Sequence, residues 1–441
     1  MGASPAVDEG DRGFRHGLAG LLLLILTLLA IARAVGGGIP GWVPGLLGWV
    51  AIGLLWTRLK KMQKIQSLLL LAGGVTATLI ALVQGVVPVP RVFLQANVDL
   101  VALLAGVGFL RLVAVPPRTR KRSRESGSSA FLRTLFGTHL LSAVINLSAL
   151  FIVADRLLPA NGDKARVLAP LARAFSAAAF WSPFFAAMGV ALTYAPGARV
   201  DVLVLQGLPL ALLALGLTYW ELRRSDPEGV KNFVGYPLHF EALWLPAVLV
   251  VGVLLLHQWL PGVSIILLVA ALSLLLSLLV LGVRAPGRAF QEWWGHVITG
   301  LPRQAGEFTL FLAAGVFATG MGLLFHANAG SLLLDHFDLL TACGLLLVMV
   351  VLAVAGVHPV ISIAMAGVWL APLALDPNML GFLFLSTWAI GVVAAPFSGM
   401  NLALAGRYGV DGRTVLQWHI RYVPVMLVAA MIALAAYFPS S

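Results

Sequence analysis

Two apolar stretches of this chain are each interrupted by polar residues, and a Pro-Phe break follows each interruption. In the first stretch the residues concerned are Asn146, Ser148, Ser182 and Pro183. In the second stretch they are His358, Pro359, Pro396, Ser398, Gly399 and Asn401. The interval is 37 positions from Asn146 to Pro183 and 38 positions from His358 to Pro396. The matching spacing indicates an internal repeat.

These residue types are suited to binding a small ligand or an ion at membrane depth. An asparagine amide both donates and accepts hydrogen bonds, and an unpaired amide is costly in an apolar medium. His358 can donate to an anion or carry a proton. Each proline frees a carbonyl group, and the half-helix beyond it presents N–H groups with a positive dipole. Because lipid tolerates unwound backbone only where it is buried or lines a cavity, the paired breaks predict a substrate site at the centre of the repeat.

Each of these residues also has a purely structural interpretation. Asn146 and Ser148 can bond neighbouring helix backbones, and a single proline can simply kink a helix. For Asn146 and the two proline breaks we favour binding, because they occur as matched pairs. For His358 the two interpretations stay level, since a hairpin-tip histidine near the external surface can be satisfied by a backbone carbonyl.

Charged residues within apolar stretches are further candidates. Arg173 lies about two to three turns into an apolar run, where it needs a partner or a cavity. It is a candidate for attracting an anion, and the competing interpretation is that it snorkels to the cytoplasmic interface. Glu307 is a candidate coupling charge, and Asp99 is a further intramembrane candidate; for either residue an interfacial position is the alternative. Three residues of an expected external turn are interpreted as loop residues that form no metal site: Asp335, His336 and Asp338.

The composition requires many membrane-spanning helices. Of the 441 residues, 60% are hydrophobic and 11% charged, and the mean hydropathy of +0.96 lies far outside the range of soluble domains. The single cysteine, Cys343, excludes an intrachain disulfide. Spanning runs are expected at 17–35, 42–57, 65–87, 97–115, 166–194, 202–220, 241–259, 262–283, 306–325, 380–405 and 421–438. The expected fold is an all-α polytopic membrane protein with about eleven transmembrane helices plus two re-entrant hairpins, at 131–156 and 337–375, in an inverted repeat.

With this arrangement the basic residues sort strongly to one side of the membrane. The connecting segments on that side carry 24 lysines and arginines, against two, Arg91 and Arg199, on the other. Cytoplasmic loops collect positive charge, so we expect a cytoplasmic N-terminus and an external C-terminus in a bacterial-type inner membrane. The net charge of +11 is then mostly topological, and no nucleic-acid partner is expected. The dense run 118–124 is interpreted as a cytoplasmic linker, with anionic lipid as an alternative partner, and 286–304 as an interfacial helix.

The order of surface element, hairpin and broken helix resembles the ion transporter superfamily. Its best-known member is the divalent anion/sodium symporter family, with arsenite and citrate permeases as relatives. SAVINLSALFIVADRLLP looks like the first hairpin tip with its descending limb, and GVHPVISIAMAGVWLAPLA looks like the second. FWSPFFAAMG and AAPFSGMNLALAG look like the two unwound loops. The resemblance covers roughly 97 to 438.

The resemblance implies a secondary active transporter of a small organic or inorganic anion, with a carboxylate favoured. It also implies coupling to Na⁺ or H⁺, a homodimer in the lipid bilayer, and alternating access by an elevator-like displacement. In that family a Ser-Asn-Thr tip contacts the substrate carboxylate and helps to frame sodium sites. The tips here read Ile-Asn-Leu-Ser and Val-His-Pro instead. The substrate, the coupling ion and the direction of transport therefore stay open.

The chain is expected to divide into four parts along its length. These are scaffold helices with a basic linker at 1–130, the first hairpin and broken helix at 131–200, scaffold helices with an interfacial helix at 201–304, and the second hairpin, broken helix and last helix at 305–441. No metalloprotease, hydrolase or phosphate-loop motif occurs, so we expect neither an enzyme nor a cofactor. Two alternatives stay open: an integral-membrane enzyme acting on a lipid-linked substrate, and a channel-like or scaffold membrane protein.

Overall fold

The structure is a computed structural model that describes residues 5–114, 125–236, 244–328 and 336–438. Every regular element in these ranges is a helix, which confirms the all-α expectation, and one isolated bridge pairs Ser126 with Val234. The basic run 118–124 and Asp335 lie outside the described residues. Contacts divide the chain into two units, which are described one at a time. Unit 1 comprises Met1–Val115 and Val248–Leu332, and unit 2 comprises Pro116–Ala247 and Leu333–Ser441.

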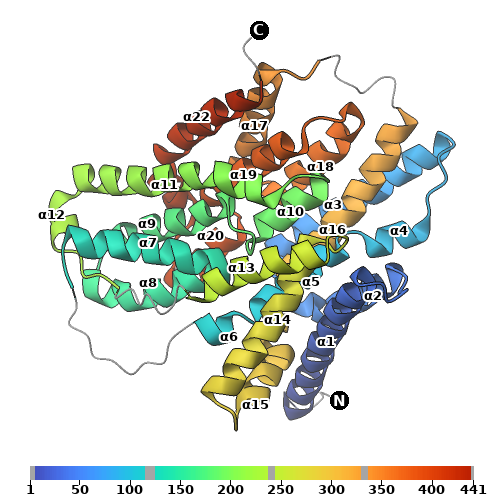
Figure 1. The fold of residues 1–441 in the computed structure, drawn as a ribbon, viewed down its shortest axis with the longest axis horizontal. Coiled ribbons are helices and arrows are strands. Elements are labelled where there is room, and N and C mark those ends of the chain that lie inside the picture. Colours follow the sequence, from blue (N-terminus) through green and yellow to red (C-terminus); the bar gives the residue numbers. More distant parts are fainter. Residues whose placement is uncertain (1–4, 115–124, 237–243, 329–335, 439–441) are drawn as a thin grey trace. The chain divides into compact units, whose positions relative to one another are not determined.

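Unit 1 is built from apolar helices, because a helix satisfies its own backbone groups where water is absent (Figure 1). Its helices are α1 (Pro5–Ala34), α2 (Trp42–Leu55), α3 (Lys61–Val83), α4 (Pro90–Gln95), α5 (Val98–Gly108), α6 (Arg111–Ala114), α14 (Ile265–Arg284), α15 (Ala289–Gly295) and α16 (Ala305–Ala327). Helix α13 (Trp244–Trp259) begins at the boundary with unit 2. Between α15 and α16 the chain forms a short π-helix, η4 (His296–Gly300), and a short 3₁₀-helix, η5 (Leu301–Gln304).

Helices α3 and α16 touch backbone to backbone within unit 1. A Cβ atom on Gly320 would lie 2.1 Å from the carbonyl oxygen of Gly74, and one on Gly74 would lie 2.7 Å from the carbonyl oxygen of Val316. Neither position has room for a side chain. Such close approach increases van der Waals contact between helices in lipid, where the hydrophobic effect does not drive them together.

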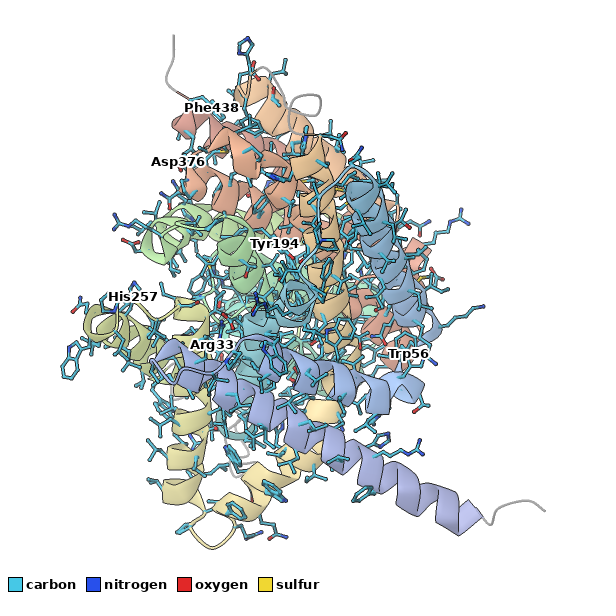
Figure 2. All side chains as sticks on the ribbon, turned by 90° about the vertical axis from the view of Figure 1, so that its right-hand side faces the viewer. Arg33, Trp56, Tyr194, His257, Asp376 and Phe438 are labelled. Carbon is cyan, nitrogen blue, oxygen red and sulfur yellow. The ribbon has the colours of Figure 1, made fainter. Side chains whose placement is uncertain are left out.

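Asp99 in unit 1 is used in an ion pair. Nη2 of Arg33 donates to Oδ1 of Asp99 over 2.9 Å, and Figure 2 labels Arg33 at the end of α1. The neighbouring Asn97 has a left-handed backbone with a φ of 59°, and its amide donates to the carbonyl oxygen of Phe311 over 2.9 Å. These contacts tie the start of α5 to α1 and α16.

Unit 2 contains two helical hairpins and two interrupted helices. Its helices are α7 (Ser128–Ile145), α8 (Leu147–Asn161), α9 (Lys164–Ala177), α10 (Ala186–Tyr194), α11 (Val200–Ser225), α12 (Pro227–Lys231), α17 (Leu339–Val354), α18 (Pro359–Leu370), α19 (Pro377–Ala394), α20 (Gly399–Tyr408), α21 (Gly412–His419) and α22 (Tyr422–Leu434). Helix α7 packs on α8, and α17 packs on α18 (Figure 1). The helical path α9–α10 breaks around Pro183, and the path α19–α20 breaks around Pro396.

Acidic residues begin many of the helices of unit 2. An aspartate accepts backbone N–H groups at the start of α9, α12, α17, α19 and α21, which are the residues Asp163, Asp226, Asp338, Asp376 and Asp411. Such caps satisfy donors that a helix cannot satisfy itself, and the negative charge favours the helix N-terminus. Asp338, which was interpreted as a loop residue, is therefore the cap of α17.

Seven helical segments of the described chain are long and apolar enough to cross a membrane, or eight if the pair α21–α22, bent by 55°, is one span. The chain is therefore a multi-pass membrane protein. The count of about eleven crossings stays a prediction, as does the four-part division along the chain. The contacts group both hairpins and both interrupted helices in unit 2, together with α11, and place α16 in unit 1.

Candidate functional site

The first hairpin turns at a single residue, Asn146, between α7 and α8. Its φ of 50° lies in the left-handed region that residues with a side chain adopt rarely and with strain. Its side-chain Nδ2 donates to the carbonyl oxygen of Phe184 over 3.3 Å. Phe184 lies in the break between α9 and α10, so the tip of the hairpin is bonded to the interrupted helix.

Ser182 links the same two segments in the opposite direction. Its Oγ donates to the carbonyl oxygen of Ala143 in α7 over 2.5 Å and accepts the backbone N–H of Phe184 over 3.2 Å. The hydroxyl is fully buried and satisfied in both of its roles. Pro183 has no N–H to donate, which suits the interruption of the helix at this point. Ser148 is half-buried in the first turn of α8.

His139 is a third link, which sequence reasoning missed. Its Nδ1 lies 3.0 Å from the carbonyl oxygen of Ala174, so this nitrogen carries the proton and donates. Its Nε2 accepts from Nε1 of Trp181 over 3.0 Å. Ala174 precedes the break and Trp181 lies within it, so the buried ring bridges hairpin and interrupted helix. The available signal was a lone histidine in an apolar run, and its spacing matched nothing in the second half.

The second hairpin tip packs on its break through rings. Gly356 has a φ of 104°, and a Cβ atom there would lie 2.8 Å from Cδ2 of Phe397 in the break between α19 and α20. His358 caps α18, because its Nδ1 accepts the backbone N–H of Val360 over 3.2 Å. Its ring meets Trp388 edge-on, with the ring centroids 5.4 Å apart. The partner of His358 is thus a backbone N–H, whereas the structural interpretation above assumed a carbonyl.

Asn401 turns its amide onto the end of its own interrupted helix. Its Nδ2 lies 2.8 Å from the carbonyl oxygen of Ala395 and 3.4 Å from the carbonyl oxygens of Val392 and Val393. The amide therefore caps the C-terminus of α19, where carbonyl groups lack helical partners. Asn401 is 1% exposed, and among the described residues its Oδ1 has no hydrogen-bond partner. Since the nitrogen faces three acceptors, the chemistry fixes which end of the amide is the unpartnered oxygen.

The rest of the second break is organised around Ser398. Its Oγ accepts the backbone N–H of Asn401 over 3.2 Å and caps α20, which begins at Gly399. Pro396 packs closely on Gly412, where a Cβ atom would lie 2.7 Å from the Cβ of the proline. Pro359 opens α18 and is buried.

Unit 2 contains buried polar atoms without partners among the described residues. Besides Oδ1 of Asn401, these include the hydroxyl groups of Ser142 in α7 and Ser386 in α19. Leaving such an atom unsatisfied costs about 1–3 kcal/mol. Buried polar groups of this kind mark places where a ligand, an ion or a water molecule completes the structure.

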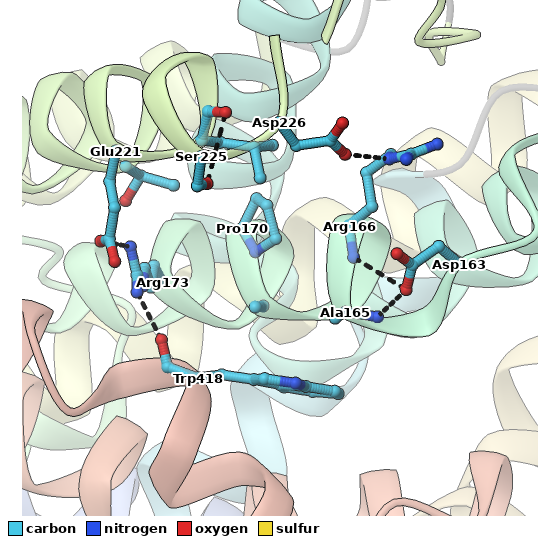
Figure 3. Close-up of a pocket in the computed structure, with 12 residues that line it drawn as sticks. Asp163, Ala165, Arg166, Pro170, Arg173, Glu221, Ser225, Asp226 and Trp418 are labelled. Carbon is cyan, nitrogen blue, oxygen red and sulfur yellow. Dashed lines mark hydrogen bonds and ion pairs between the residues drawn. The ribbon is translucent and has the colours of Figure 1, made fainter. Parts of the chain in front are cut away.

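Arg173 is bonded to several protein groups, of which Figure 3 shows Glu221 and Trp418. Its Nη1 donates to Oε2 of Glu221 over 2.7 Å, its Nη2 to the carbonyl oxygen of Trp418 over 2.6 Å, and its Nε to Nδ1 of His419 over 3.1 Å. The guanidinium also lies 4.6 Å from the ring centre of Tyr422. Arg173 therefore ties α9 to α11 and to the bend between α21 and α22.

A cleft of about 250 Å³ lies beside Arg173, lined by residues of α9 and α11 with Trp418 of α21. Figure 3 shows that its charged residues face one another across the cleft. Nε of Arg166 donates to Oδ2 of Asp226 over 2.6 Å, and Asp163 accepts backbone N–H groups of α9. Since the guanidinium groups already have carboxylate partners, the cleft is better suited to holding helices together than to binding an anion.

A further connection joins the two halves of unit 2 and was also missed. Arg407 in α20 forms an ion pair with Asp155 in α8, with Nε 3.1 Å from Oδ1. The hydroxyl of Tyr408 donates to the same carboxylate over 2.7 Å, and Nζ of Lys164 donates to the carbonyl oxygen of Tyr408 over 2.7 Å. Apart from Asp155, these residues lie in segments that the sequence analysis interpreted as cytoplasmic loops, whose basic residues only set the orientation of the chain.

Glu307 belongs to unit 1, where it lies in the first turn of α16 and is an exposed residue. It has no ion-pair partner among the described residues. The other predicted site residues belong to unit 2, so the contacts do not group Glu307 with them. Within the described ranges, no three His, Cys, Asp or Glu side chains come together as ligands of a metal ion.

No protein-family model matches the chain, and no curated protein matches it at a significant level.

Proposed function

We propose that the protein is a secondary active transporter of a small organic or inorganic anion, with a carboxylate favoured, coupled to Na⁺ or H⁺. The observation that carries this proposal is that two hairpin tips meet two helix breaks within one unit. Asn146 reaches Phe184 in the first half, and Gly356 contacts Phe397 in the second. Polar groups beside unwound backbone are the arrangement with which membrane transporters bind substrates and ions.

Each half contributes different groups to the proposed site. The N-termini of α10 and α20 present N–H groups and a positive dipole, which favour an anion. Because Nδ1 of His358 accepts a hydrogen bond, its Nε2 carries the proton and can donate to an anionic substrate. The unpartnered Oδ1 of Asn401 can accept from a substrate or bind a cation. Arg173 has a supporting role in this proposal, and Glu307 remains a candidate coupling charge.

The proposal includes eleven crossings and two re-entrant hairpins. Helix α18 has 12 residues, about 18 Å, and α17 has 16 residues, about 24 Å, whereas the hydrocarbon core is about 30 Å thick. Apolar helices of these lengths suit a segment that enters the bilayer and returns. We further propose a homodimer in a bacterial-type inner membrane, with the N-terminus in the cytoplasm and the C-terminus outside, working by elevator-like alternating access.

The test begins with the ligand. The purified full chain is screened for thermal stabilisation by carboxylates and oxyanions, with Na⁺ and pH varied, because a bound ligand stabilises the folded state. The compound that stabilises most is then followed in proteoliposomes with and without an ion gradient. We expect saturable uptake that depends on the gradient.

The variants for this assay are Asn146→Ala and Asn401→Ala, with Asn232→Ala as the matched control on the exposed end of α12. We expect uptake to fall at least tenfold in the first two and to be unchanged in the control, at equal expression. Unchanged uptake in both site variants would contradict the proposed site. Flux without saturation or gradient dependence would contradict a coupled transporter.

A further inference from the structure

The first hairpin is joined to the end of the second interrupted helix by a clasp, which consists of Asp155, Arg407, Tyr408 and Lys164. Nε of Arg407 donates to Oδ1 of Asp155 over 3.1 Å, and its Nη2 donates to Oδ2. The hydroxyl of Tyr408 also donates to Oδ1, over 2.7 Å, and Nζ of Lys164 donates to the carbonyl oxygen of Tyr408 over 2.7 Å. One carboxylate of α8 thus receives three hydrogen bonds from the end of α20.

The two helices that carry the clasp do not pack closely on each other. Helix α8 packs on α7 and α9, and α20 packs on α19 and α21, whereas α8 and α20 are not a closely packed pair among the described residues. Side chains therefore hold these helices together where a packed helix interface is lacking. A contact of this kind can open without repacking the apolar core of unit 2.

The clasp lies equally far along the chain from both halves of the proposed transport site. Helix α8 starts after Asn146 and α20 starts after Ser398. Asp155 follows Asn146 by nine positions (155 − 146), and Arg407 follows Ser398 by nine positions (407 − 398). At a rise of 1.5 Å per residue, this is about 14 Å along each helix. Both helices therefore begin at the proposed site and are fastened to each other the same number of turns beyond it.

Contacts beside the clasp show which sides of the two helices face each other. The guanidinium of Arg407 lies 5.4 Å from the ring centre of Phe151, which is one turn before Asp155, and the ring of Tyr408 lies 6.2 Å from the same ring. On α20 the residue one turn before Arg407 is Ala403, which is half-buried. The side of α20 that carries the clasp thus has a small side chain between the clasp and the site.

The clasp is accessible to water and belongs to the expected cytoplasmic side. The side chains of Arg407 and Asp155 are 53% and 40% exposed, so water competes for their bonds and the ion pair is easily broken. The sorting of basic residues predicts a cytoplasmic position for the segments 156–166 and 407–421, which adjoin or include the clasp.

We propose that the clasp is a gate on the cytoplasmic side of the transport site. When it is closed, Asp155 and Arg407 hold α8 at the end of α20 and keep water from the helix starts at Asn146 and Ser398. When it opens, the two helices part and the site becomes accessible from the cytoplasm. The gate rests on the function proposed above, because it controls access to that same site.

The test measures access to the segment between the clasp and the site, and it needs no substrate. Cys343→Ser removes the only cysteine of the chain, and Ala403→Cys supplies a reporter in the full chain in lipid nanodiscs. The rate at which a charged maleimide labels the reporter is then measured. We expect Asp155→Asn and Arg407→Gln each to raise this rate about fivefold, as the loss of a partly exposed ion pair implies. The double variant should raise it no further, because each change removes the same clasp.

Asp201→Asn is the matched control, because it breaks the exposed ion pair with Arg199 at the start of α11. It should leave the labelling of Ala403→Cys unchanged. A second reporter, Ala214→Cys, lies on the buried side of α11, where Ala214 is 0% exposed, and should stay unlabelled in every variant. Tyr408→Phe removes only the hydroxyl donor, and we expect it to raise the labelling rate about twofold. It keeps the test decisive if a charge variant does not fold.

The proposal is overturned if the clasp variants leave the labelling of Ala403→Cys unchanged, or if the effects of the two charge variants add. It is also overturned if Asp201→Asn raises the rate equally, or if Ala214→Cys becomes labelled in the clasp variants. Unchanged labelling in a protein with normal uptake contradicts the gate alone. Raised labelling in a protein without saturable uptake supports the opening of the clasp and contradicts the transporter.

Discussion

The two hairpin tips of unit 2 meet their helix breaks by different means. The first tip is held to its break by hydrogen bonds that involve the side chains of Asn146, Ser182 and His139. The second packs through the rings of Phe397 and Trp388, while Asn401 turns its amide onto its own helix. In the first half the side chains of Asn146, Ser182 and His139 are all hydrogen-bonded and the hydroxyl of Ser142 is not, whereas in the second half the amide oxygen of Asn401 has no partner among the described residues. The difference suggests that the first half supplies a fixed frame and the second half supplies free binding groups.

The strongest test of this contrast replaces Asn146 and Asn401, one at a time, with aspartate. Asn401→Asp places a carboxylate oxygen against three carbonyl oxygens, whereas Asn146→Asp opposes only one. We expect Asn401→Asp to lower the free energy of unfolding by about 3 kcal/mol or more, since it buries an unpaired charge and loses the cap. Thermal unfolding in detergent measures this. Equal destabilisation by the two variants would remove the contrast.

Gly356→Ala tests the ring packing of the second tip. The new Cβ atom would overlap the ring of Phe397, and alanine is strained at a φ of 104°. We expect a loss of about 2–3 kcal/mol. Gly409→Ala is the control, because Gly409 has a φ of 67° but open space around its Cβ position. If the contact with Phe397 causes the extra loss, adding Phe397→Ala to Gly356→Ala should restore stability by the amount by which Gly356→Ala is less stable than Gly409→Ala.

Ser182→Ala should cost more stability than Ser398→Ala. The first removes a donor to Ala143 and an acceptor for the N–H of Phe184, which leaves two buried backbone groups unsatisfied. The second removes one helix cap. We expect losses of about 2 and about 1 kcal/mol, measured by thermal unfolding. The reverse order would show that the first break is not held by its serine.

Asn146→Gly separates strain from hydrogen bonding at the first tip. Glycine relieves about 1 kcal/mol of strain at the left-handed backbone and loses a hydrogen bond of about the same worth. We therefore expect nearly unchanged stability, whereas Asn146→Ala should lose about 1 kcal/mol. Uptake should fall in both variants. Wild-type uptake by Asn146→Gly would show that the tip acts through its backbone alone.

The smallest expected effect is a dependence on pH at the start of the second hairpin. The hydroxyl and the backbone N–H of Thr341 donate to Asp338 and hold the pKa of its carboxyl below the ordinary value. The stabilisation is present above the unfolded pKa of about 3.8 and is lost as the pH falls through the lowered pKa of the folded state. When the pH is lowered from 6 to 3.5, we expect the Tm of Asp338→Asn to fall slightly less than the Tm of the wild type. The first hairpin begins at Gly127 and has no such cap.

The apolar pattern of the sequence predicted the class of fold and the positions of both interruptions, because period and polarity decide where a membrane helix can continue. Proline marked the breaks at Pro183, Pro359 and Pro396 in advance. The partners of polar side chains could not be predicted in this way. Arg173 finds Glu221 and Trp418 through contacts 48 and 245 positions apart, which no local pattern encodes. His139 was missed for the same reason, since both of its partners come from another helix path.

The close backbone contact between Gly74 and Gly320 makes the α3–α16 pair a useful distance reference. Because the two backbones lie too close to admit a side chain at Gly74 or Gly320, we expect spin labels on the exposed faces of the two helices to keep one distance while other parts of the protein move. A pair of labels on these helices therefore calibrates pulsed-resonance measurements of motion elsewhere in the chain. A change in that distance would show that the contact between the two helices had been lost.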